Sequence, residues 1–534
     1  MAKPDKPPAP EARPGAKKDS DKGGKADAQG ITPRATSYSE WYLDLIKYAE
    51  LAEHSAVRGC MVIRPHGYSI WEKMQRELDD RFKATGHVNA YFPLFIPLSF
   101  FSREEQHAAG FAKECAVVTH HRLKTIDGQV QVDPDSKLEE PLVVRPTSET
   151  IIWNQYKGWI QSYRDLPILI NQWANVVRWE LRTRLFLRTA EFLWQEGHTA
   201  HASEEDAMEE TFRMLGVYAD FAENVMAVPV IRGKKTPGER FAGALETLCI
   251  EAMMQDGKAL QCGTSHYLGQ NFSKAADVKF LNREGKLEYV YATSWGASTR
   301  LIGALIMTHS DDVGLILPPK LAPIHVAIVP IYRKEDEKAR VMAEAEAVYK
   351  ELKAQGLTVK LDDRDNLQPG AKYYEWECKG VPIRIEIGPK DLEKGVLCIV
   401  RRFVSEIPGE SAEDQRKRKK AFLPRAEALA GIKDILSAMQ GELFLRARAQ
   451  HQARTRIIDN LADFERFFKD EGGGFAWVHF AGDAKEEDEM ARRFETTVRC
   501  IPLPDQIPEA ARGSGTCLLT GKPSAQRVVM AKAY

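Results

Sequence analysis

The sequence lacks the features of a membrane protein and of a disulfide-stabilised secreted protein. Its 534 residues contain eight cysteines, and no two of them form a Cys-x-x-Cys pair. We therefore expect reduced thiols, as in a cytoplasmic protein, and no thiolate zinc site. No apolar run approaches the roughly 20 residues of a membrane span.

The sequence also lacks an excess of charge of one sign, and its beginning lacks aromatic side chains. Lysine and arginine (75) balance aspartate and glutamate (76), so contact with nucleic acid would need local basic patches. The first aromatic residue is Tyr38, and the preceding segment is rich in proline, glycine, alanine and lysine. Because it has no apolar core and contains acidic residues, it resembles neither a secretory signal nor a transit peptide. We predict a disordered tail over residues 1–36.

The rest of the chain predicts an α/β (α+β) protein with three further parts. Helical and strand patterns alternate over residues 37–320. Residues 321–415 follow a strand, helix, strand order typical of a small α/β domain. Residues 416–534 form a last region, which begins near a basic run, QRKRKK, and contains long helical patterns. That run is as consistent with a solvated surface as with contact to phosphates.

The segment RWELRTRLFLRTAEFLWQEGH carries the strongest chemical signal. A strand ending in VVRWEL would place Arg178 and Glu180 on one face, and a returning strand would place Trp194, Glu196 and His198 on one face. Arginine beside a carboxylate suits a nucleotide phosphate and its Mg²⁺. The alternative, with about equal weight, is a hairpin with a surface salt bridge between Arg178 and Glu180. The connecting loop adds three more arginines, Arg182, Arg184 and Arg188.

Two other segments carry polar groups that could face a ligand. In RPTSET, Thr147 and Glu149 could bind an ammonium or imino group, or Thr147 or Ser148 could simply cap a helix. In SWGASTRLIGALIM, Arg300 opens a buried helix, so it needs an anionic or aromatic partner or a core carboxylate.

A third segment, QCGTSHYLGQNF, combines small residues with polar side chains. Small residues let a ligand approach the backbone, and Gln261, Thr264 and His266 supply polar groups there. A buried histidine that only satisfies its own hydrogen bonds remains an alternative for His266.

Taken in order, these segments resemble motifs 1, 2 and 3 of class II aminoacyl-tRNA synthetases. RPTSET, NQWANVVRWE, EFLWQEGH, GTSHYLGQNFSK and SWGASTR are similar to those of prolyl-tRNA synthetases without an inserted editing domain. The resemblance runs from about Tyr38 to Tyr534. It implies an antiparallel class II catalytic sheet with flanking helices in residues 37–320, an anticodon-binding α/β domain in 321–415 and a small C-terminal domain in 416–534.

The resemblance also implies an activity and partners. The enzyme would be a proline--tRNA ligase that uses ATP with Mg²⁺ to form prolyl-adenylate and passes the prolyl group to tRNA(Pro). It would work in the cytoplasm as a homodimer whose interface includes the motif 1 stretch, residues 59–93. Too few residues separate motif 2 from motif 3 for an added editing domain, so we do not expect hydrolysis of alanyl-tRNA in cis.

The implied site residues fall into three groups. The catalytic and ATP-binding residues would be Arg178, Glu180, Arg188, Gln261, Thr264, Ser298 and Arg300, of which Arg178, Glu180 and Arg300 are the catalytic ones. The proline-binding residues would be Thr147, Glu149, Arg178, Trp194, His198, Phe241 and His266. The anticodon-binding residues would be Glu377, Lys379, Arg384 and Asp391, each with strand-edge charge as its alternative.

The end of the chain departs from the family pattern. Relatives often hold zinc with four cysteines there, but Ala481 and Glu486 stand where the first two would fall, and only Cys500 and Cys517 remain. No bound zinc is therefore expected in this region. In relatives the terminal tyrosine lies near the active site, which is the expectation for Tyr534.

Three other functions were weighed. A class II enzyme for another amino acid is one, although threonine would need a metal in the pocket. A synthetase-like protein that only binds or regulates tRNA is the second. The third is a metal hydrolase using His198 and His201, a weak pattern without flanking carboxylates.

Overall fold

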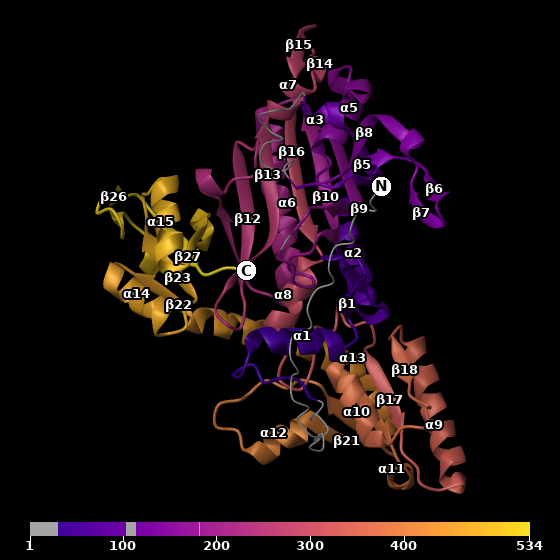
Figure 1. Ribbon diagram of the computed structural model, residues 1–534. Coiled ribbons are helices and arrows are strands. Elements are labelled where there is room, and N and C mark those ends of the chain that lie inside the picture. The colour runs from indigo at the N-terminus through magenta and orange to yellow at the C-terminus, as the bar shows by residue number, and fades with distance from the viewer. Residues whose placement is uncertain (1–29, 103–113, 181) are drawn as a thin grey trace, which may run out of the picture.

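The computed structural model describes residues 30–102, 114–180 and 182–534, and Figure 1 shows their arrangement. Its largest feature is an 11-stranded sheet in the order β22-β23-β27-β24-β11-β12-β13-β16-β10-β9-β3. A five-stranded sheet, β18-β17-β19-β20-β21, lies at the lower right. The mixed α/β fold predicted from the sequence is confirmed. Within these described ranges, no helix is both long and apolar enough to cross a membrane.

The first part of the chain supplies the strands β1 (Ala52–His54), β2 (Met61–Ile63), β3 (Val88–Asn89), β4 (Phe95–Pro97), β5 (Val117–His120), β6 (Leu123–Ile126), β7 (Gln129–Val132), β8 (Lys137–Val144), β9 (Ile168–Val177), β10 (Glu191–His201), β11 (Val230–Lys234), β12 (Glu246–Met253), β13 (Ala259–Gly269), β14 (Lys279–Leu281), β15 (Leu287–Tyr289) and β16 (Tyr291–Ser298). Its helices are α1 (Tyr38–Tyr48), α2 (Pro65–Ala84), α3 (Leu98–Ser102), α5 (Glu149–Trp159), α6 (Glu204–Asn224), α7 (Asn271–Ala275) and α8 (Arg300–His309).

The strands from β9 to β11 in the large sheet pair antiparallel, as the class II resemblance implies. Alternation along each strand separates two faces. On one face, Gln195 accepts a hydrogen bond from Tyr218 of α6 (2.6 Å), and Ser265 donates to the backbone of the same helix. A side chain at Gly197 would lie 2.0 Å from the ring of Trp295. This face is therefore closed by packing, and the residues that alternate with it point to the opposite face.

The five-stranded sheet is built from β17 (Val326–Pro330), α9 (Glu335–Ala354), β18 (Val359–Leu361), α10 (Pro369–Cys378), β19 (Ile383–Ile387), α11 (Pro389–Lys394), β20 (Val396–Arg401), α12 (Ala412–Lys419), β21 (Lys420–Pro424) and α13 (Arg425–Ala453). The expected boundary after residue 415 falls inside this unit. Strand β21 pairs with β20, and Ile432 and Met439 of α13 are buried in the same core as Ile385. Hydrophobic burial continues to Leu443, so α13 belongs to this core rather than to the last region.

The last region contains β22 (Thr455–Ile458), α14 (Leu461–Lys469), β23 (Phe475–His479), α15 (Ala484–Phe494), β24 (Thr497–Pro502), β25 (Gly515–Thr516), β26 (Pro523–Ser524) and β27 (Arg527–Ala531). Its sheet continues the catalytic sheet, because β24 pairs with β11. A Cβ at Gly233 of β11 would stand 2.6 Å from the Cβ and Sγ of Cys500. Glycine at this position therefore lets the two strands approach.

The predicted tail over residues 1–36 ends earlier than expected. Residues 1–29 lie outside the described part of the chain, but residues 30–36 contact the folded protein. The backbone N–H and hydroxyl of Thr32 both donate to Asp44, at 2.9 and 2.7 Å. Arg34 forms an ion pair with Asp312 at 3.0 Å.

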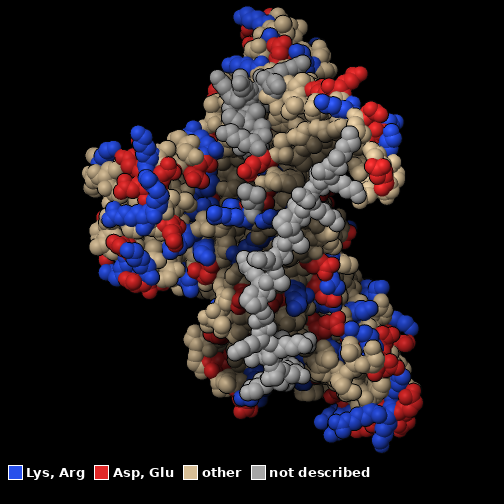
Figure 2. Space-filling view, viewed as in Figure 1, with Lys and Arg blue, Asp and Glu red and all other residues tan. Residues whose placement is uncertain are grey.

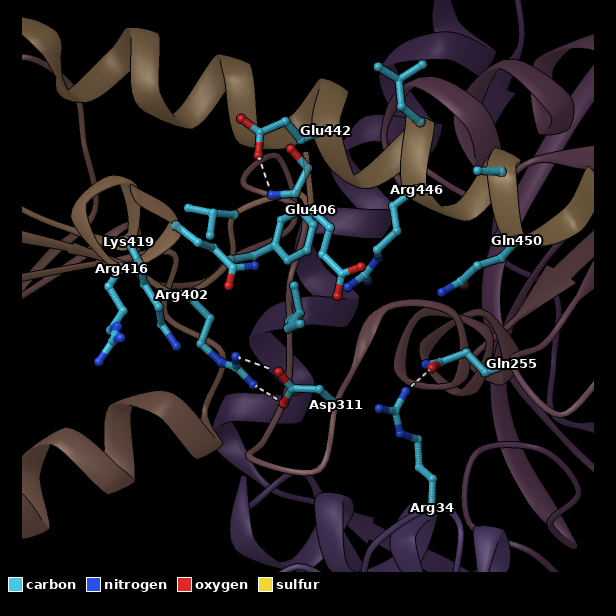
Figure 3. Close-up of a pocket in the computed structure, with 17 residues that line it drawn as sticks. Arg34, Gln255, Asp311, Arg402, Glu406, Arg416, Lys419, Glu442, Arg446 and Gln450 are labelled. Atoms are coloured by element: carbon cyan, nitrogen blue, oxygen red, sulfur yellow. Dashed lines mark hydrogen bonds and ion pairs between the residues drawn. The ribbon is translucent and has the colours of Figure 1, made fainter. Parts of the chain in front are cut away.

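A cavity of 820 Å³ separates the catalytic part from the five-stranded unit, and Figure 3 shows its lining. Across it, Arg402 of the five-stranded unit forms two hydrogen bonds to Asp311, at 3.0 and 2.5 Å, and Arg34 donates to Gln255. On the face seen in Figure 2, lysine and arginine side chains gather in the hollow between the catalytic sheet and the C-terminal strands.

Candidate active site

A cavity of 140 Å³ opens on the face of the catalytic sheet opposite α6. It brings together nine of the residues predicted from the sequence, namely Glu149, Arg178, Trp194, His198, Phe241, Thr264, His266, Ser298 and Arg300. Seven of them come from β10, β13, β16 and the starts of α5 and α8, whereas Arg178 follows β9 and Phe241 lies in the loop before β12. The alternation predicted for EFLWQEGH is confirmed, because Trp194, Glu196 and His198 all line the cavity.

Arg178 reaches the cavity, but the predicted strand geometry around it is wrong. Strand β9 ends at Val177, so Arg178 lies just beyond it. The Arg178 Nε donates to the carbonyl of Pro146 (2.9 Å), and its guanidinium lies over the rings of Phe192 and Trp194, 5.6 and 5.5 Å from their centroids. Burial lowers the pKa of Arg178, and the nearby carboxylates oppose this effect. A guanidinium stays charged at neutral pH, so the cavity holds a desolvated cation.

Glu180 does not share this cavity. Its carboxylate accepts the backbone N–H of Arg182 (2.7 Å) and lies 3.7 Å from Arg188, whose side chain is 53% exposed. The alternative of an Arg178–Glu180 surface salt bridge is therefore also wrong, because the partner of Glu180 is Arg188. Glu180 and Arg188 lie on the loop between β9 and β10 rather than in the cavity.

Glu196 is the centre of a buried hydrogen-bond network. It accepts from Ser148 (2.5 Å) and Gln172 (2.8 Å), and its second oxygen lies 2.9 Å from His198 Nε2. Burial alone would lower the pKa of His198, but the hydrogen bond and charge of Glu196 raise it above its ordinary value. Burial likewise opposes ionisation of Glu196, and His198 and the hydroxyl and amide donors lower its pKa overall. Both shifts favour the ion-paired form of Glu196 and His198.

The same network contradicts the alternative in which RPTSET only supplies a side-chain cap to a helix. Ser148 occupies the N-cap position of α5, but its side chain makes no capping hydrogen bond and instead donates to Glu196. Thr147 Oγ1 donates to the carboxylate of Glu149, and both side chains are buried. Thr147 itself does not reach the cavity lining, so it acts on the cavity only through Glu149.

His266 has the opposite electrostatic character to His198. Burial lowers the pKa of His266 to about 3, so its ring is neutral at physiological pH. Its Nδ1 lies 3.0 Å from Thr247 Oγ1, and its ring centroid lies 4.5 Å from that of Phe241. One wall of the cavity is therefore apolar and uncharged.

Arg300 is the second buried arginine of the cavity. It is the first residue of α8, and its Nε donates to the carbonyl of Leu187 (3.3 Å) on the loop between β9 and β10. Burial lowers its pKa, yet the guanidinium remains charged. Thr264 and Ser298 line the wall beside it. Gln261 does not line the cavity, although it lies on the same strand as Thr264.

The lining also includes residues that the sequence did not predict, among them Phe192 and Ser294. Phe192 precedes Trp194 by two residues, so strand alternation alone could have indicated it. Ser294 pairs in the sheet with both His198 and His266. That pairing joins segments about 30 and 100 residues apart, and no local pattern reveals it.

The predicted anticodon residues do not form one cluster. Arg384 donates to Glu377 (2.9 Å), and its guanidinium lies 4.1 Å from the ring centroid of Tyr373. Lys379 instead forms ion pairs with Glu375 of its own helix and Glu50 of the catalytic part, at 2.8 and 2.7 Å.

Asp391 has a local structural role in the same unit. It accepts the backbone N–H of Gly388 at 2.9 Å, at the start of the short helix α11. Its side chain therefore satisfies a helix terminus, which is the ordinary role of an acidic residue at this position.

The C-terminal residue packs against the loop between β9 and β10. The Tyr534 hydroxyl donates to Asp256 (2.6 Å), and its N–H donates to the carbonyl of Ala259 (3.1 Å). The guanidinium of Arg184 lies 5.2 Å from the Tyr534 ring centroid. Tyr534 thus touches the loop that also contacts Arg300.

The cysteines predicted not to bind zinc lie apart. Cys500 is buried against Cys249 of β12, whose Sγ lies 3.8 Å from the carbonyl of Arg499. Cys517 packs in a different core with Phe480. Among the residues that the structure describes, no group of three or more His, Cys, Asp or Glu could hold a metal ion.

Comparison with family models identifies the class of protein. Residues 130–309 match the tRNA synthetase class II core domain (G, H, P, S and T), and residues 325–434 match the anticodon binding domain. Together with the antiparallel sheet and its two buried arginines, this defines a class II aminoacyl-tRNA synthetase.

The particular family follows from the end of the chain and from its relatives. Residues 461–534 match the family model of the prolyl-tRNA synthetase C-terminal domain. The proline--tRNA ligase of Christiangramia forsetii is 57% identical over 95% of this chain and 100% of its own length, and that of Bacteroides fragilis is 56% identical over 95% and 99%. The one from Porphyromonas gingivalis is 57% identical over 94% and 99%. The chain belongs to the prolyl-tRNA synthetase family.

Proposed function

We propose that this enzyme activates L-proline with ATP to give prolyl-adenylate and transfers the prolyl group to the 3′ end of tRNA(Pro). The observation that carries the proposal is one small cavity in which two buried arginines adjoin an apolar wall and a buried acidic network. The two arginines suit phosphates and a carboxylate, and the wall suits an aliphatic ring.

The amino-acid part of the cavity is complementary to proline. Glu149, held by Thr147, would take the positively charged imino group, and Arg178 would take the carboxylate. Trp194, Phe241 and the neutral ring of His266 supply flat walls for the pyrrolidine ring. The hydrogen-bonded pair of His198 and Glu196 forms the floor of the cavity and would exclude amino acids with longer side chains.

The reaction needs positive charge more than a nucleophile. The carboxylate of proline attacks the α-phosphate of ATP, so two anions must meet, and catalysis comes mainly from positioning and charge neutralisation. Arg178 would hold the α-phosphate and Arg300 the outer phosphates and adenine. Thr264 and Ser298 would add contacts from the wall, and Gln261 an approach from the adjoining strand.

The loop between β9 and β10 would act on the outer phosphates. Arg188 is exposed there, and Glu180 offers the carboxylate nearest to it. Mg²⁺ accompanies ATP in class II enzymes and prefers phosphate and carboxylate oxygens. When bound, it would neutralise the pyrophosphate, with Glu180 as the residue suited to hold it.

The tRNA would be read by the five-stranded unit. Arg384 and Glu377 offer a donor and an acceptor next to each other beside the ring of Tyr373, which suits hydrogen bonding and stacking with unpaired guanines. Lys379 and Asp391 lie outside this pair, because Lys379 is held by Glu375 and Glu50 and Asp391 accepts the backbone N–H of Gly388. The eight free thiols are consistent with a reducing cytoplasm.

We also propose a homodimer. Strand β3 of motif 1 ends the eleven-stranded sheet, and its Val88 and the nearby Tyr91 are 61% and 71% exposed. An exposed apolar sheet edge favours pairing with another chain. Sedimentation equilibrium should give twice the 60.2 kDa chain mass.

The proposal is tested by charging tRNA with labelled proline. The wild-type enzyme should form acid-precipitable prolyl-tRNA, and Arg178→Gln should lose activity by at least a hundredfold, since a single transition-state contact contributes about 10²–10³ in rate. Arg182→Gln, on the same loop but exposed, is the matched control and should stay within about threefold of wild type. Charging with a different amino acid, or an undiminished Arg178→Gln enzyme, would contradict the proposal.

A further inference from the structure

A fully buried carboxylate joins the C-terminal region to the catalytic sheet. Glu251 of β12 has no exposed surface, and its oxygens accept from Lys235 Nζ at 2.9 Å. Arg499 of β24 donates to the same carboxylate from Nε (3.1 Å) and from Nη2 (3.0 Å). Lys235 Nζ also donates to the carbonyl of Arg499 (2.7 Å), so the three residues form one closed cluster.

The cluster lies on the active-site face of the sheet. Thr247 of β12 pairs with His266, and Cys249 pairs with Thr264; both partners line the active-site cavity. Because alternate residues of a strand share a face, Glu251 points the same way as Thr247 and Cys249. Its own partner in the ladder is Gln261, the proposed ATP contact of β13.

The charged residues of the cluster also act electrostatically on Arg300. Burial would raise the pKa of Glu251, but Lys235 and Arg499 lower it below its ordinary value, so it stays ionised. Burial lowers the pKa of Arg300, and among its charged neighbours Glu251 raises this pKa and Arg499 lowers it. Without Arg499, a buried carboxylate with a single cationic partner would stand beside Gln261 and within the field of Arg300.

A mere domain clamp does not account for this arrangement. Strand β24 already pairs with β11 through Gly233 and Lys234, and an apolar cluster including Cys249, Phe475 and Trp477 packs across the same junction. Burying a carboxylate with two cations adds little net stability compared with apolar packing, because desolvation offsets the attraction. Its position beside the nucleotide contacts points to a role in the reaction.

We propose that Arg499 is a positioning residue for the ATP site, supplied by the C-terminal region. It neutralises and holds Glu251, so that Glu251 does not form an ion pair with Arg300 or a hydrogen bond with Gln261. Both side chains then remain directed at the nucleotide. The inference rests on the proposed function and extends it, since it makes the C-terminal region a contributor to ATP use rather than an appendage.

The test uses ATP–pyrophosphate exchange with the full-length enzyme, titrating ATP and proline separately. Arg499→Gln should raise KM for ATP, or lower kcat at saturating proline, by about tenfold, while KM for proline stays within twofold. The triple variant Lys235→Met/Glu251→Gln/Arg499→Gln removes the buried carboxylate together with both of its cationic partners, and should recover most of the loss.

The matched control is Arg527→Gln. Arg527 lies on β27 of the same region, its side chain is 9% exposed, and it forms an ion pair with Asp459 rather than with Glu251. It should leave both KM values unchanged. Thermal unfolding of each variant shows whether the C-terminal region is still folded. Should Arg499→Gln not fold, Arg499→Lys carries the same test with a smaller rise in KM for ATP.

Three results would overturn the inference. These are an Arg499→Gln enzyme with kcat/KM for ATP within twofold of wild type, a parallel rise in KM for both substrates, or a triple variant no better than the single one. Failure of the proposed function is distinguishable, because it would appear as an absence of proline-dependent exchange in the wild-type enzyme itself.

Discussion

Tyr534 provides a prediction whose size can be worked from the structure. Its hydroxyl bonds a carboxylate, Asp256, and such a charge-assisted bond contributes about 1.5–3 kcal/mol. The guanidinium of Arg184 over its ring adds about 0.5–1 kcal/mol. Arg184 belongs to the loop whose Leu187 carbonyl accepts from Arg300. Loss of these contacts should therefore loosen the loop and disturb Arg300, the arginine that we propose binds ATP.

We expect Tyr534→Phe to raise KM for ATP about fivefold, on the assumption that about 1 kcal/mol of the lost hydrogen bond reaches the loop. Deleting Tyr534 removes the ring as well and should raise KM for ATP more than tenfold. Both variants should leave KM for proline nearly unchanged. A tag appended after Tyr534 should have the same direction of effect.

The assay is ATP–pyrophosphate exchange over a range of ATP concentrations. Lys532→Met is the control, because Lys532 lies two residues earlier and pairs with Glu495 rather than with the loop. If the protein without Tyr534 is folded and its KM for ATP stays within twofold of wild type, the proposed link between the C-terminus and the loop is refuted.

Three further predictions concern the cavity and the anticodon unit. Arg300→Gln should raise KM for ATP at least tenfold in the exchange assay. Added proline should still raise the melting temperature of this variant as much as it does for the wild type. The pKa of His198 is raised in the folded state, so its ion pair with Glu196 stabilises the protein below pH 6.5 and this contribution is lost as the pH rises through the raised pKa. Glu196→Gln should therefore lower the melting temperature more at pH 6 than at pH 9. An equal loss at both pH values would contradict the pairing of His198 with Glu196. Arg384→Gln should raise KM for tRNA about 5- to 150-fold, equivalent to about 1–3 kcal/mol, without affecting exchange. Lys379→Gln should mainly lower the melting temperature, as expected of a contact between domains.

Much of the local structure was predictable because burial imposes a period on the sequence. Ile70, Met74, Leu78 and Phe82 of α2 recur at helical spacing and are buried. Trp194, Glu196 and His198, at alternate positions of β10, all line the cavity. The end of β9 was not predictable. The sequence places another large aromatic residue, Trp179, two positions after Val177, but the ladder stops at Val177, and Trp179 is 56% exposed.

Features that depend on distant partners were beyond the sequence. The pairing of β24 with β11 brings together strands more than 250 residues apart, and it requires a glycine opposite Cys500. The ion pair between Lys379 and Glu50 links two parts of the chain that no periodicity connects. The spacing of residues in the sequence indicated which side chains could bind a nucleotide. It did not indicate which charged side chains are already paired with another residue.

The site shows the same division. Glu196 was placed on the correct face by strand alternation, yet its partners Ser148 and Gln172 come from two other elements. Those partners, together with His198, decide that the carboxylate remains charged. Chemistry of this kind depends on three-dimensional proximity, which a single sequence does not encode in any local pattern.

The central claim is that this cavity activates proline with ATP. The most direct measurement is exchange of labelled pyrophosphate into ATP by the purified enzyme without tRNA, run separately with each of the twenty amino acids. The account predicts exchange with proline, with at most weak signals from alanine and cysteine, since small side chains are rejected only weakly by an apolar pocket. Strong exchange with another amino acid, or none from folded protein, would contradict it.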